Sequence, residues 1–243
     1  NRRSSNLKMY EFGNCYHFSP EKNNDEDPIK AYTEEMHLGM WLTGKRVEGS
    51  WAHADEQSSF YELKAYVMNI FTRLGVNPGI VVTESSDNNV FGKALALKAR
   101  SGKVLCEMGI VSHKLLKKMD IEQEVFYADI NWDNMMRAIK KNEVLYHDIC
   151  KFPSVSRDLA LLLDKNVQFE QIEQIARQTE KKLLKSVELF DVYEGKNLPE
   201  GKKSYAVNFI LQDEARTLND KQIEAIMSKL INNLKTKLGA ELR

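Results

Sequence analysis

The sequence has 243 residues, of which 42% are hydrophobic and 29% are charged. These fractions are ordinary for a globular protein and exclude a disordered chain. None of its apolar runs reaches the roughly 18 residues that a membrane-spanning helix requires. The 35 basic residues balance the 35 acidic residues, so the composition lacks the basic excess that marks most nucleic-acid-binding proteins.

The first part of the chain is predicted to form a sheet with few helices. Apolar and aromatic runs predict strands over Leu7–Phe18, His37–Thr43, Ile80–Glu84, Ala94–Ala99, Val104–Val111 and Val125–Ile130. Helical spacing of apolar residues predicts helices over Ser58–Leu74 and Trp132–Lys141, with Asn131 as the cap of the second. Because strands and helices do not alternate, the pattern favours an antiparallel α+β domain.

The second part has a strand and helix order of its own. Its elements are a strand at Arg157–Asp164, a helix at Phe169–Leu184, hairpin arms at Val187–Tyr193 and Ser204–Leu211, a helix at Asn219–Leu238, and a closing AELR. This β-α-β-β-α-β order is the ferredoxin-like pattern. A boundary is expected between residues 142 and 152, which divides the chain into domains 1–147 and 148–243.

The hairpin carries the residues of greatest functional interest. Alternation along a strand places Asp191 and Tyr193 on one face and Phe190 and Val192 on the other, so the apolar pair is expected in the core. An aromatic ring beside a carboxylate, near a lysine-rich loop, suits the capture of one unstacked base. On these residues alone, the alternative is that Tyr193 is a sheet-edge tyrosine and Asp191 a surface acid.

Other motifs predict neither a phosphate loop nor a metal site. GMWLTGKR at residues 39–46 matches a phosphate loop at all but the last position, but arginine replaces the hydroxyl that would hold magnesium. Cys15 with His17, and His147 with Cys150, supply two ligand types each, whereas a closed zinc site needs four ligands. Three widely spaced cysteines fit a reducing compartment better than a disulfide framework.

Five segments occur in order within residues 151–243: FPSVSRDLALLLD, ELFDVYEG, LPEGKKSYAVNFILQD, RTLND and GAELR. Together they resemble the C-terminal anticodon-binding domain of the bacterial phenylalanyl-tRNA synthetase β subunit. YEFG at residues 10–13 and EVFYADINWD at residues 124–133 resemble the class II core-like segment of the same subunit. The resemblance implies an antiparallel class II synthetase-like sheet domain followed by a ferredoxin-like anticodon-binding domain. It also implies a fragment of a longer protein.

The resemblance implies specific site residues. The family holds the first anticodon base, a guanine, with the aspartate and tyrosine of FDVY and the serine of GKKS, here Asp191, Tyr193 and Ser204. A carboxylate accepts hydrogen bonds from the donor groups of guanine, and stacking on an aromatic ring contributes about 1–3 kcal/mol per base. Nearby basic residues are expected to be phosphate contacts or structural residues: Arg157, Lys202, Lys203 and Arg216.

The resemblance further implies the context of the intact enzyme, a cytoplasmic α2β2 phenylalanine–tRNA ligase that uses ATP and magnesium. We expect no catalytic residue, metal or cofactor in this chain, because its late arginine, Arg137, lies in a predicted helix without the glycine-rich strand of the third class II motif. The first domain is expected to pack against the catalytic α subunit, and the second to bind the anticodon of tRNA(Phe). A rival interpretation is a ferredoxin-like regulatory or protein-interaction module that binds no RNA.

Overall fold

The computed structural model describes residues 4–22, 28–76, 81–85, 89–99, 101–140, 146 and 148–243. The chain divides into two compact units, Asn1–Leu145 and Tyr146–Arg243, and each unit has its own hydrophobic core. The division falls two residues before the boundary expected from the sequence. Among the described residues, no helix is long and apolar enough to cross a membrane.

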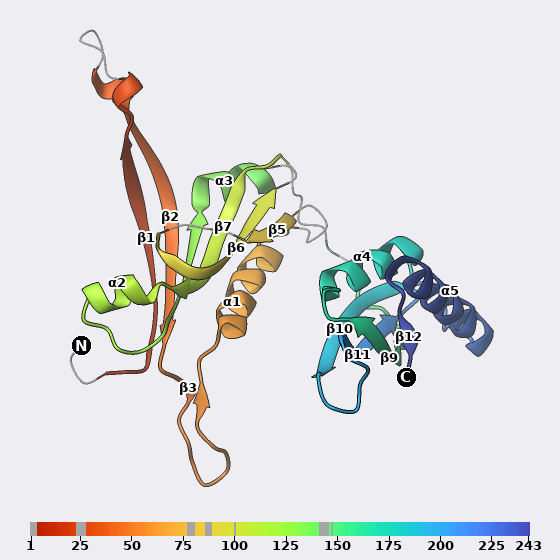
Figure 1. Ribbon diagram of the computed structural model, residues 1–243. Coiled ribbons are helices and arrows are strands. Elements are labelled where there is room, and N and C mark those ends of the chain that lie inside the picture. Colours follow the sequence, from red (N-terminus) through yellow and green to blue (C-terminus); the bar gives the residue numbers. More distant parts are fainter. Residues whose placement is uncertain are drawn as a thin grey trace. The chain divides into compact units, whose positions relative to one another are not determined.

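The first unit is built on an antiparallel sheet (Figure 1). Its strand order is β1-β2-β8-β7-β6-β5, and each neighbouring pair is antiparallel. The strands are β1 (Leu7–Phe18), β2 (Tyr32–Thr43), β5 (Val81–Ser85), β6 (Phe91–Ala99), β7 (Val104–Val111) and β8 (Val125–Asn131). The sheet therefore has the antiparallel architecture that the sequence predicted, and a short ribbon of β3 (Lys45–Val47) and β4 (Glu56–Gln57) follows β2.

Two helices of the first unit cover one face of this sheet. Helix α1 (Phe60–Arg73) begins at Ser59, whose side chain accepts the Glu62 N–H. Helix α3 (Trp132–Ile139) begins at Asn131, the cap that the sequence predicted. Apolar side chains from both helices pack with the even-numbered inner positions of β2 and β8, so the odd-numbered positions of those strands lie on the opposite face. A third helix, α2 (His113–Lys118), was not predicted.

Strands β1 and β2 form a long hairpin that extends beyond the rest of the sheet (Figure 1). Strand β2 begins five residues before the predicted start, because its polar first residues pair with the far end of β1, as Phe18 does with Tyr32. The two 3-10 helices η1 (Pro20–Lys22) and η2 (Pro28–Ala31) lie near the tip. Strand β1 is an edge strand, and its aromatic side chains Tyr10, Phe12 and Tyr16 are exposed.

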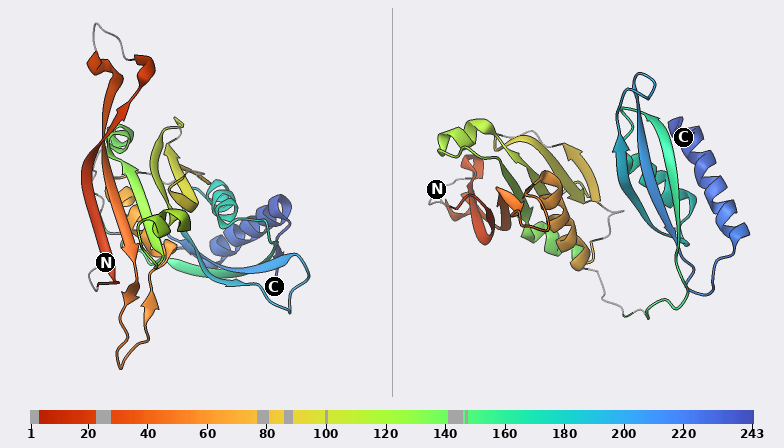
Figure 2. Two further views of the ribbon diagram at one scale, coloured as in Figure 1. Left: turned by 60° about the vertical axis from the view of Figure 1, so that its left-hand side comes forward. Right: turned by 90° about the horizontal axis from the view of Figure 1, so that it is seen from below.

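The second unit is a four-stranded antiparallel sheet with two helices on one face (Figure 2, right-hand view). The strand order is β10-β11-β9-β12. Its elements are β9 (Val155–Asp164), α4 (Phe169–Thr179), β10 (Leu184–Tyr193), β11 (Lys202–Leu211), α5 (Asp220–Leu238) and β12 (Glu241–Leu242). This is the β-α-β-β-α-β order that the sequence predicted.

The core of the second unit fixes which face of the sheet is open. Leu161 and Leu163 of β9 and Tyr205, Val207 and Phe209 of β11 are buried in one cluster with α4 and α5. Successive side chains point to opposite faces, so the even-numbered positions of β9 and β11 lie on the face without helices. We call this surface the open face.

The expectation that Phe190 and Val192 lie in the core is wrong. Phe190 is 60% exposed and Val192 is 48% exposed. A register shift between Leu189 and Asp191 makes Phe190 an extra residue in the β10–β11 ladder, and such a bulge interrupts the simple alternation of faces. In addition, β10 is an edge strand, so its last residues have a neighbouring strand on one side only.

Candidate nucleic-acid interface

The residues predicted for base binding line one pocket on the open face of the second unit. The pocket has a volume of about 570 Å³ and is lined by Ala160, Asp191, Tyr193, Asn197, Ser204, Ala206 and Arg243. We call it the Tyr193 pocket. Its volume lies within the range of about 300–1,000 Å³ that is typical of small-ligand sites. Four separate chain segments therefore meet where the sequence placed the site.

The strand register explains why these side chains converge. Tyr193 lies directly opposite Ser204, and Asp191 lies opposite Ala206. On the next strand, Ala206 lies opposite Ala160. The two alanines carry only methyl groups, so they leave a low floor between the larger side chains of β10 and the chain end beside β9. A flat ring can lie on such a floor.

The Tyr193 ring is held at the rim of the pocket. Tyr193 is 36% exposed. The Arg243 guanidinium carbon lies 5.4 Å from the ring centroid, within the range of a cation–π interaction. Gly195 allows this position, because a Cβ atom at residue 195 would overlap the phenol group of Tyr193. The backbone amide of Arg243 donates to the carbonyl of Ala160 at 3.0 Å, which fixes the end of the chain beside the pocket.

The polar groups of the pocket suit the donor edge of a base. Asp191 is exposed, and within the described residues its carboxylate makes neither a hydrogen bond nor an ion pair. An ionised carboxylate only accepts hydrogen bonds, whereas the Ser204 hydroxyl both donates and accepts. Ser204 is 6% exposed, so its position is set by the sheet. Together these groups present acceptors beside an aromatic ring.

In the first unit, aromatic rings occupy the face of the sheet that helices α1 and α3 do not cover. Trp41 and Tyr127 stack with centroids 5.1 Å apart, and Tyr127 and Phe91 stack at 5.7 Å. The Trp41 ring also covers the space that a side chain at Gly39 would need. Burial raises the pKa of the Tyr127 phenol above its usual value, so the ring stays neutral.

Acidic groups lie beside this stack. Asp129 contacts His37 at 2.7 Å, and Glu35 lies 3.5 Å from the same imidazole. ATP phosphates require cationic partners, and a stack of rings flanked by carboxylates does not supply them. The stacked rings and these two carboxylates therefore offer no cation to ATP phosphates. No group of three His, Cys, Asp or Glu side chains suited to a metal occurs in the part of the chain that the structure describes, and His147 lies outside that part.

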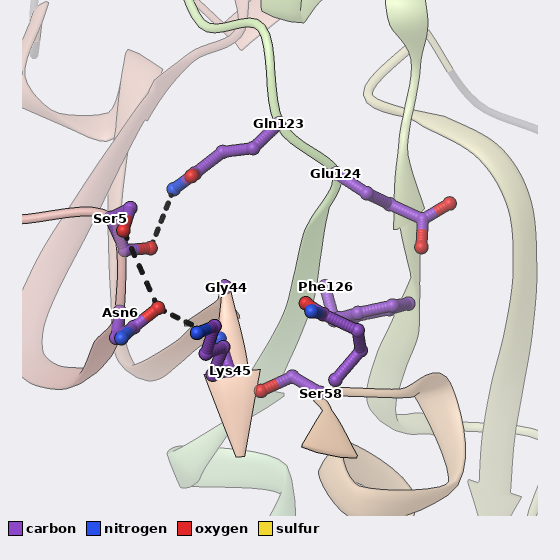
Figure 3. Close-up of a pocket in the computed structure, with 9 residues that line it drawn as sticks. Ser5, Asn6, Gly44, Lys45, Ser58, Gln123, Glu124 and Phe126 are labelled. Atoms are coloured by element: carbon purple, nitrogen blue, oxygen red, sulfur yellow. Dashed lines mark hydrogen bonds between the residues drawn. The ribbon is translucent and has the colours of Figure 1, made fainter. Parts of the chain in front are cut away.

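A second pocket, of about 390 Å³, lies in the first unit beside Ser5 and Asn6, which precede β1 (Figure 3). The Asn6 side-chain oxygen accepts the Lys45 N–H at 2.9 Å, and the Gln123 side-chain amide donates to the Ser5 carbonyl at 2.9 Å. These bonds join the segment before β1 to strand β3 and to the loop before β8. The pocket is thus bridged by its own side chains, and we assign it a structural role.

Comparison with protein families identifies both units. Residues 150–243 match the "Ferredoxin-fold anticodon binding domain". Residues 1–132, more than half of the chain, match the "Phenylalanyl tRNA synthetase beta chain CLM domain". The chain belongs to the phenylalanyl-tRNA synthetase β chain family. This confirms the resemblance drawn from the sequence and the fold class that it implied.

Curated relatives carry the same assignment. The chain is 58% identical over 243 residues to the phenylalanine--tRNA ligase beta subunits of Bacteroides fragilis and Bacteroides thetaiotaomicron. It is 50% identical over 242 residues to that of Porphyromonas gingivalis. In each case the match covers 100% of this chain and 30% of the relative. The chain therefore spans about a third of the length of these relatives.

Two lysines that were expected to be phosphate contacts or structural residues, Lys202 and Lys203, occupy different environments. Lys202 precedes the pocket residue Ser204 on the same face, and its ammonium lies 2.9 Å from Asp164. That hydrogen bond raises the pKa of Lys202, so the ammonium stays positively charged. Lys203 points to the core side, is 6% exposed, and donates to the Tyr205 hydroxyl at 2.7 Å. Lys203 is therefore a structural residue with no surface for a phosphate.

The two arginines of that set lie away from the pocket. Arg157 shares the helix-covered face with Leu161 by alternation along β9, and its guanidinium donates to the Ser156 carbonyl at 2.9 Å. Arg216 pairs with Asp213 at 3.5 Å, beyond the far end of β11. Seven residues of strand, about 24 Å at the usual rise, separate Ser204 from that end. Among the four basic residues, Lys202 alone is well placed beside the pocket.

The sequence did not assign the other pocket residues. Arg243 reaches the site because β12 pairs with β9 at Leu161 and Leu162, a contact between distant segments that local patterns do not predict. GAELR was part of the resemblance, but no role was drawn from its arginine. Asn197 lies in the hairpin loop, where composition alone indicated a turn. Gly195 ends the segment ELFDVYEG, two residues after Tyr193, and no role was drawn from it.

Proposed function

We propose that this chain is the C-terminal part of the β subunit of a phenylalanine–tRNA ligase, and that its second unit binds the anticodon of tRNA(Phe). The observation that carries the proposal is the convergence of Asp191, Tyr193 and Ser204 in one pocket on the open face. Tyr193 stacks on the first anticodon base, which is exposed once it leaves the RNA stack. Asp191 accepts hydrogen bonds from the guanine edge, and Ser204 adds one more.

The character of the pocket favours RNA over the protein-interaction alternative. An RNA site needs an exposed ring, and Tyr193 meets that requirement. A protein-binding face would present a continuous apolar surface, whereas Asp191, Asn197 and Ser204 surround the small alanine floor. The family to which the chain belongs supports the same choice.

The first unit is proposed to be a non-catalytic partner of the α subunit, in a cytoplasmic α2β2 enzyme. Its aromatic stack of Trp41, Tyr127 and Phe91 leaves catalysis, with ATP and magnesium, to the α subunit. The edge strand β1 exposes several aromatic side chains, and exposed apolar rows of this kind are typical of protein interfaces. Its unpaired backbone edge is also suited to being covered by another chain.

Binding to an anticodon stem-loop tests the proposal. The 243-residue chain is titrated with a fluorescent stem-loop of tRNA(Phe) and with a matched loop that carries adenine at the first anticodon position. We expect saturable binding that prefers guanine. A control loop from an unrelated tRNA should bind more weakly at the same ionic strength, because phosphate contacts alone are not sequence-selective. Equal binding to all loops, or none at all, would contradict the proposal.

A further inference from the structure

A loop of the first unit presents a fully exposed tryptophan. Strands β3 and β4 and the turn between them form a ribbon, residues 45–57, that projects from the end of the sheet where β1 begins (Figure 1). We call this ribbon the Trp51 loop. Trp51 lies in its turn and is 100% exposed, whereas the indoles of Trp41 and Trp132 each pack against another aromatic ring.

Hydrogen bonds within the Trp51 loop hold its turn in one shape. The Gly49 N–H donates to the Asp55 carboxylate at 2.5 Å, and the Ser50 N–H donates to the His53 carbonyl at 2.9 Å. The Ser50 hydroxyl also lies 3.1 Å from the His53 ring nitrogen Nδ1. These bonds bracket Trp51 on both sides. A side chain presented on an ordered turn loses less conformational entropy on binding than one on a flexible loop.

The charges of the Trp51 loop favour a protein partner over RNA. Each charged side chain of the loop has a partner within this chain: Lys45 pairs with Asp55, Arg46 with Glu56, and Glu48 with Asn6. Both cations are therefore engaged, and the carboxylates outnumber them. An RNA backbone is bound through cations that are free to meet its phosphates. What the loop offers instead is an indole ring, which suits an apolar pocket of a protein.

The Trp51 loop is continuous with the edge strand β1, where the α subunit is proposed to bind. Asn6, the residue before β1, donates to the Glu48 carboxylate at 2.9 Å and accepts the Lys45 N–H at 2.9 Å. Leu7 of β1 pairs with Thr43, two residues before Lys45. A subunit that covers the edge of β1 therefore meets the loop as part of the same surface.

We propose that Trp51 anchors the first unit to the α subunit by inserting its indole into an apolar pocket of α. This inference rests on the proposed function, which places α at β1, and adds to it a single anchoring residue. A large aromatic side chain buries about 150–250 Å² when it enters such a pocket. Tryptophan is also enriched among the few interface residues whose truncation weakens binding most.

Assembly of the full-length β subunit with α tests the anchor. The dissociation constant is measured by analytical ultracentrifugation over a dilution series. Trp51→Ala should weaken the binding of α at least about 30-fold, the level of an interface hot spot, and Trp51→Phe, which keeps an apolar ring, should recover part of the loss. Tyr146→Ala removes an exposed ring of the second unit and should leave the affinity unchanged. Circular dichroism verifies that each variant is folded.

Hydroxyl-radical footprinting with mass spectrometry reads the exposure of Trp51 directly. The side chain should be oxidised rapidly in the 243-residue chain and in full-length β, and it should lose most of that oxidation once α is bound. Protection in full-length β before α is added would assign the indole to another part of β and reject the proposal. Rapid oxidation that persists in the complex with α would also reject it.

A substitution on β1 separates the anchor from the proposed function. Tyr10→Asp places a charge on the exposed edge strand and should weaken the binding of α independently of the loop. If Tyr10→Asp weakens binding while folded Trp51→Ala binds at the unaltered affinity, the first unit remains the partner of α and the anchor is rejected. If unaltered full-length β does not bind α, the proposed role of the first unit is rejected and the anchor with it.

Discussion

Gly195→Ala offers a sharp test of how the pocket is built. Gly195 has no positive φ, so alanine meets no backbone strain there, but its Cβ would overlap the phenol of Tyr193. The ring is partly exposed and has room to turn outward, so we expect a stability cost below about 1 kcal/mol. The displaced ring would lose its stacking position, which is worth about 1–3 kcal/mol per base. Binding of the stem-loop should therefore weaken about 5- to 150-fold.

A double-mutant cycle distinguishes this mechanism from a general effect on the loop. If Gly195→Ala acts through the ring, then adding it to Tyr193→Ala should cause little further loss, because the two changes remove the same interaction. Gly13→Ala is the matched control, since a Cβ there meets nothing within 4 Å. Binding by Gly195→Ala at the unaltered affinity, or losses that simply add in the double variant, would show that Gly195 does not act through the Tyr193 ring.

Three further predictions follow from the placement of charges and cores. Lys202→Ala should weaken binding to every loop alike and reduce the magnitude of the salt slope by about 1, whereas Lys203→Met should alter thermal stability and leave that slope unchanged. The chain without α should give phenylalanine-dependent pyrophosphate exchange at background level, and exchange above background would show that the first unit binds ATP after all. Residues 148–243 expressed alone should fold cooperatively by circular dichroism, because the second unit holds its own core, and an unfolded spectrum would show that the boundary is misplaced.

Local patterns predicted most of the framework. Strands β1 and β7 have the predicted bounds, since each is a run of strand-forming residues that ends at a clear turn or loop. Helix α5 follows Asn219, the first residue of the predicted helix, whose side chain caps it by accepting the Gln222 N–H. Helix α4 ends at Thr179, five residues early. Its predicted last residue, Leu184, instead opens strand β10 and pairs with Leu211, a long-range contact that outweighs helical spacing.

Side-chain positions were harder to predict where a single residue changes the register or where distant segments meet. Phe190 is the extra residue of a bulge and Val192 lies near the end of the edge strand β10, and both are exposed where burial was expected. For Lys203 the sequence left a phosphate contact and a structural role open; its aliphatic chain folds over the Tyr205 ring, with the ammonium 4.5 Å from the centroid. Arg243 enters the pocket through strand pairing that no local pattern reports. The meeting of Asp191, Tyr193 and Ser204 in one pocket was predictable because family resemblance carries non-local information, and their role in base binding stays a prediction.

We propose that the pocket recognises guanine through Asp191, and the Asp191→Ala variant is the sharpest test of that recognition. The measurement is the ratio of dissociation constants for two stem-loops that carry guanine or adenine at the first anticodon position, with and without the substitution. Asp191 accepts from donors that adenine lacks at the same edge, so its loss should reduce the preference for guanine by about 1–3 kcal/mol. Tyr193→Ala, in contrast, should weaken both loops, because stacking tolerates every base. A guanine preference that Asp191→Ala leaves unchanged would contradict the account, even if the chain still binds tRNA.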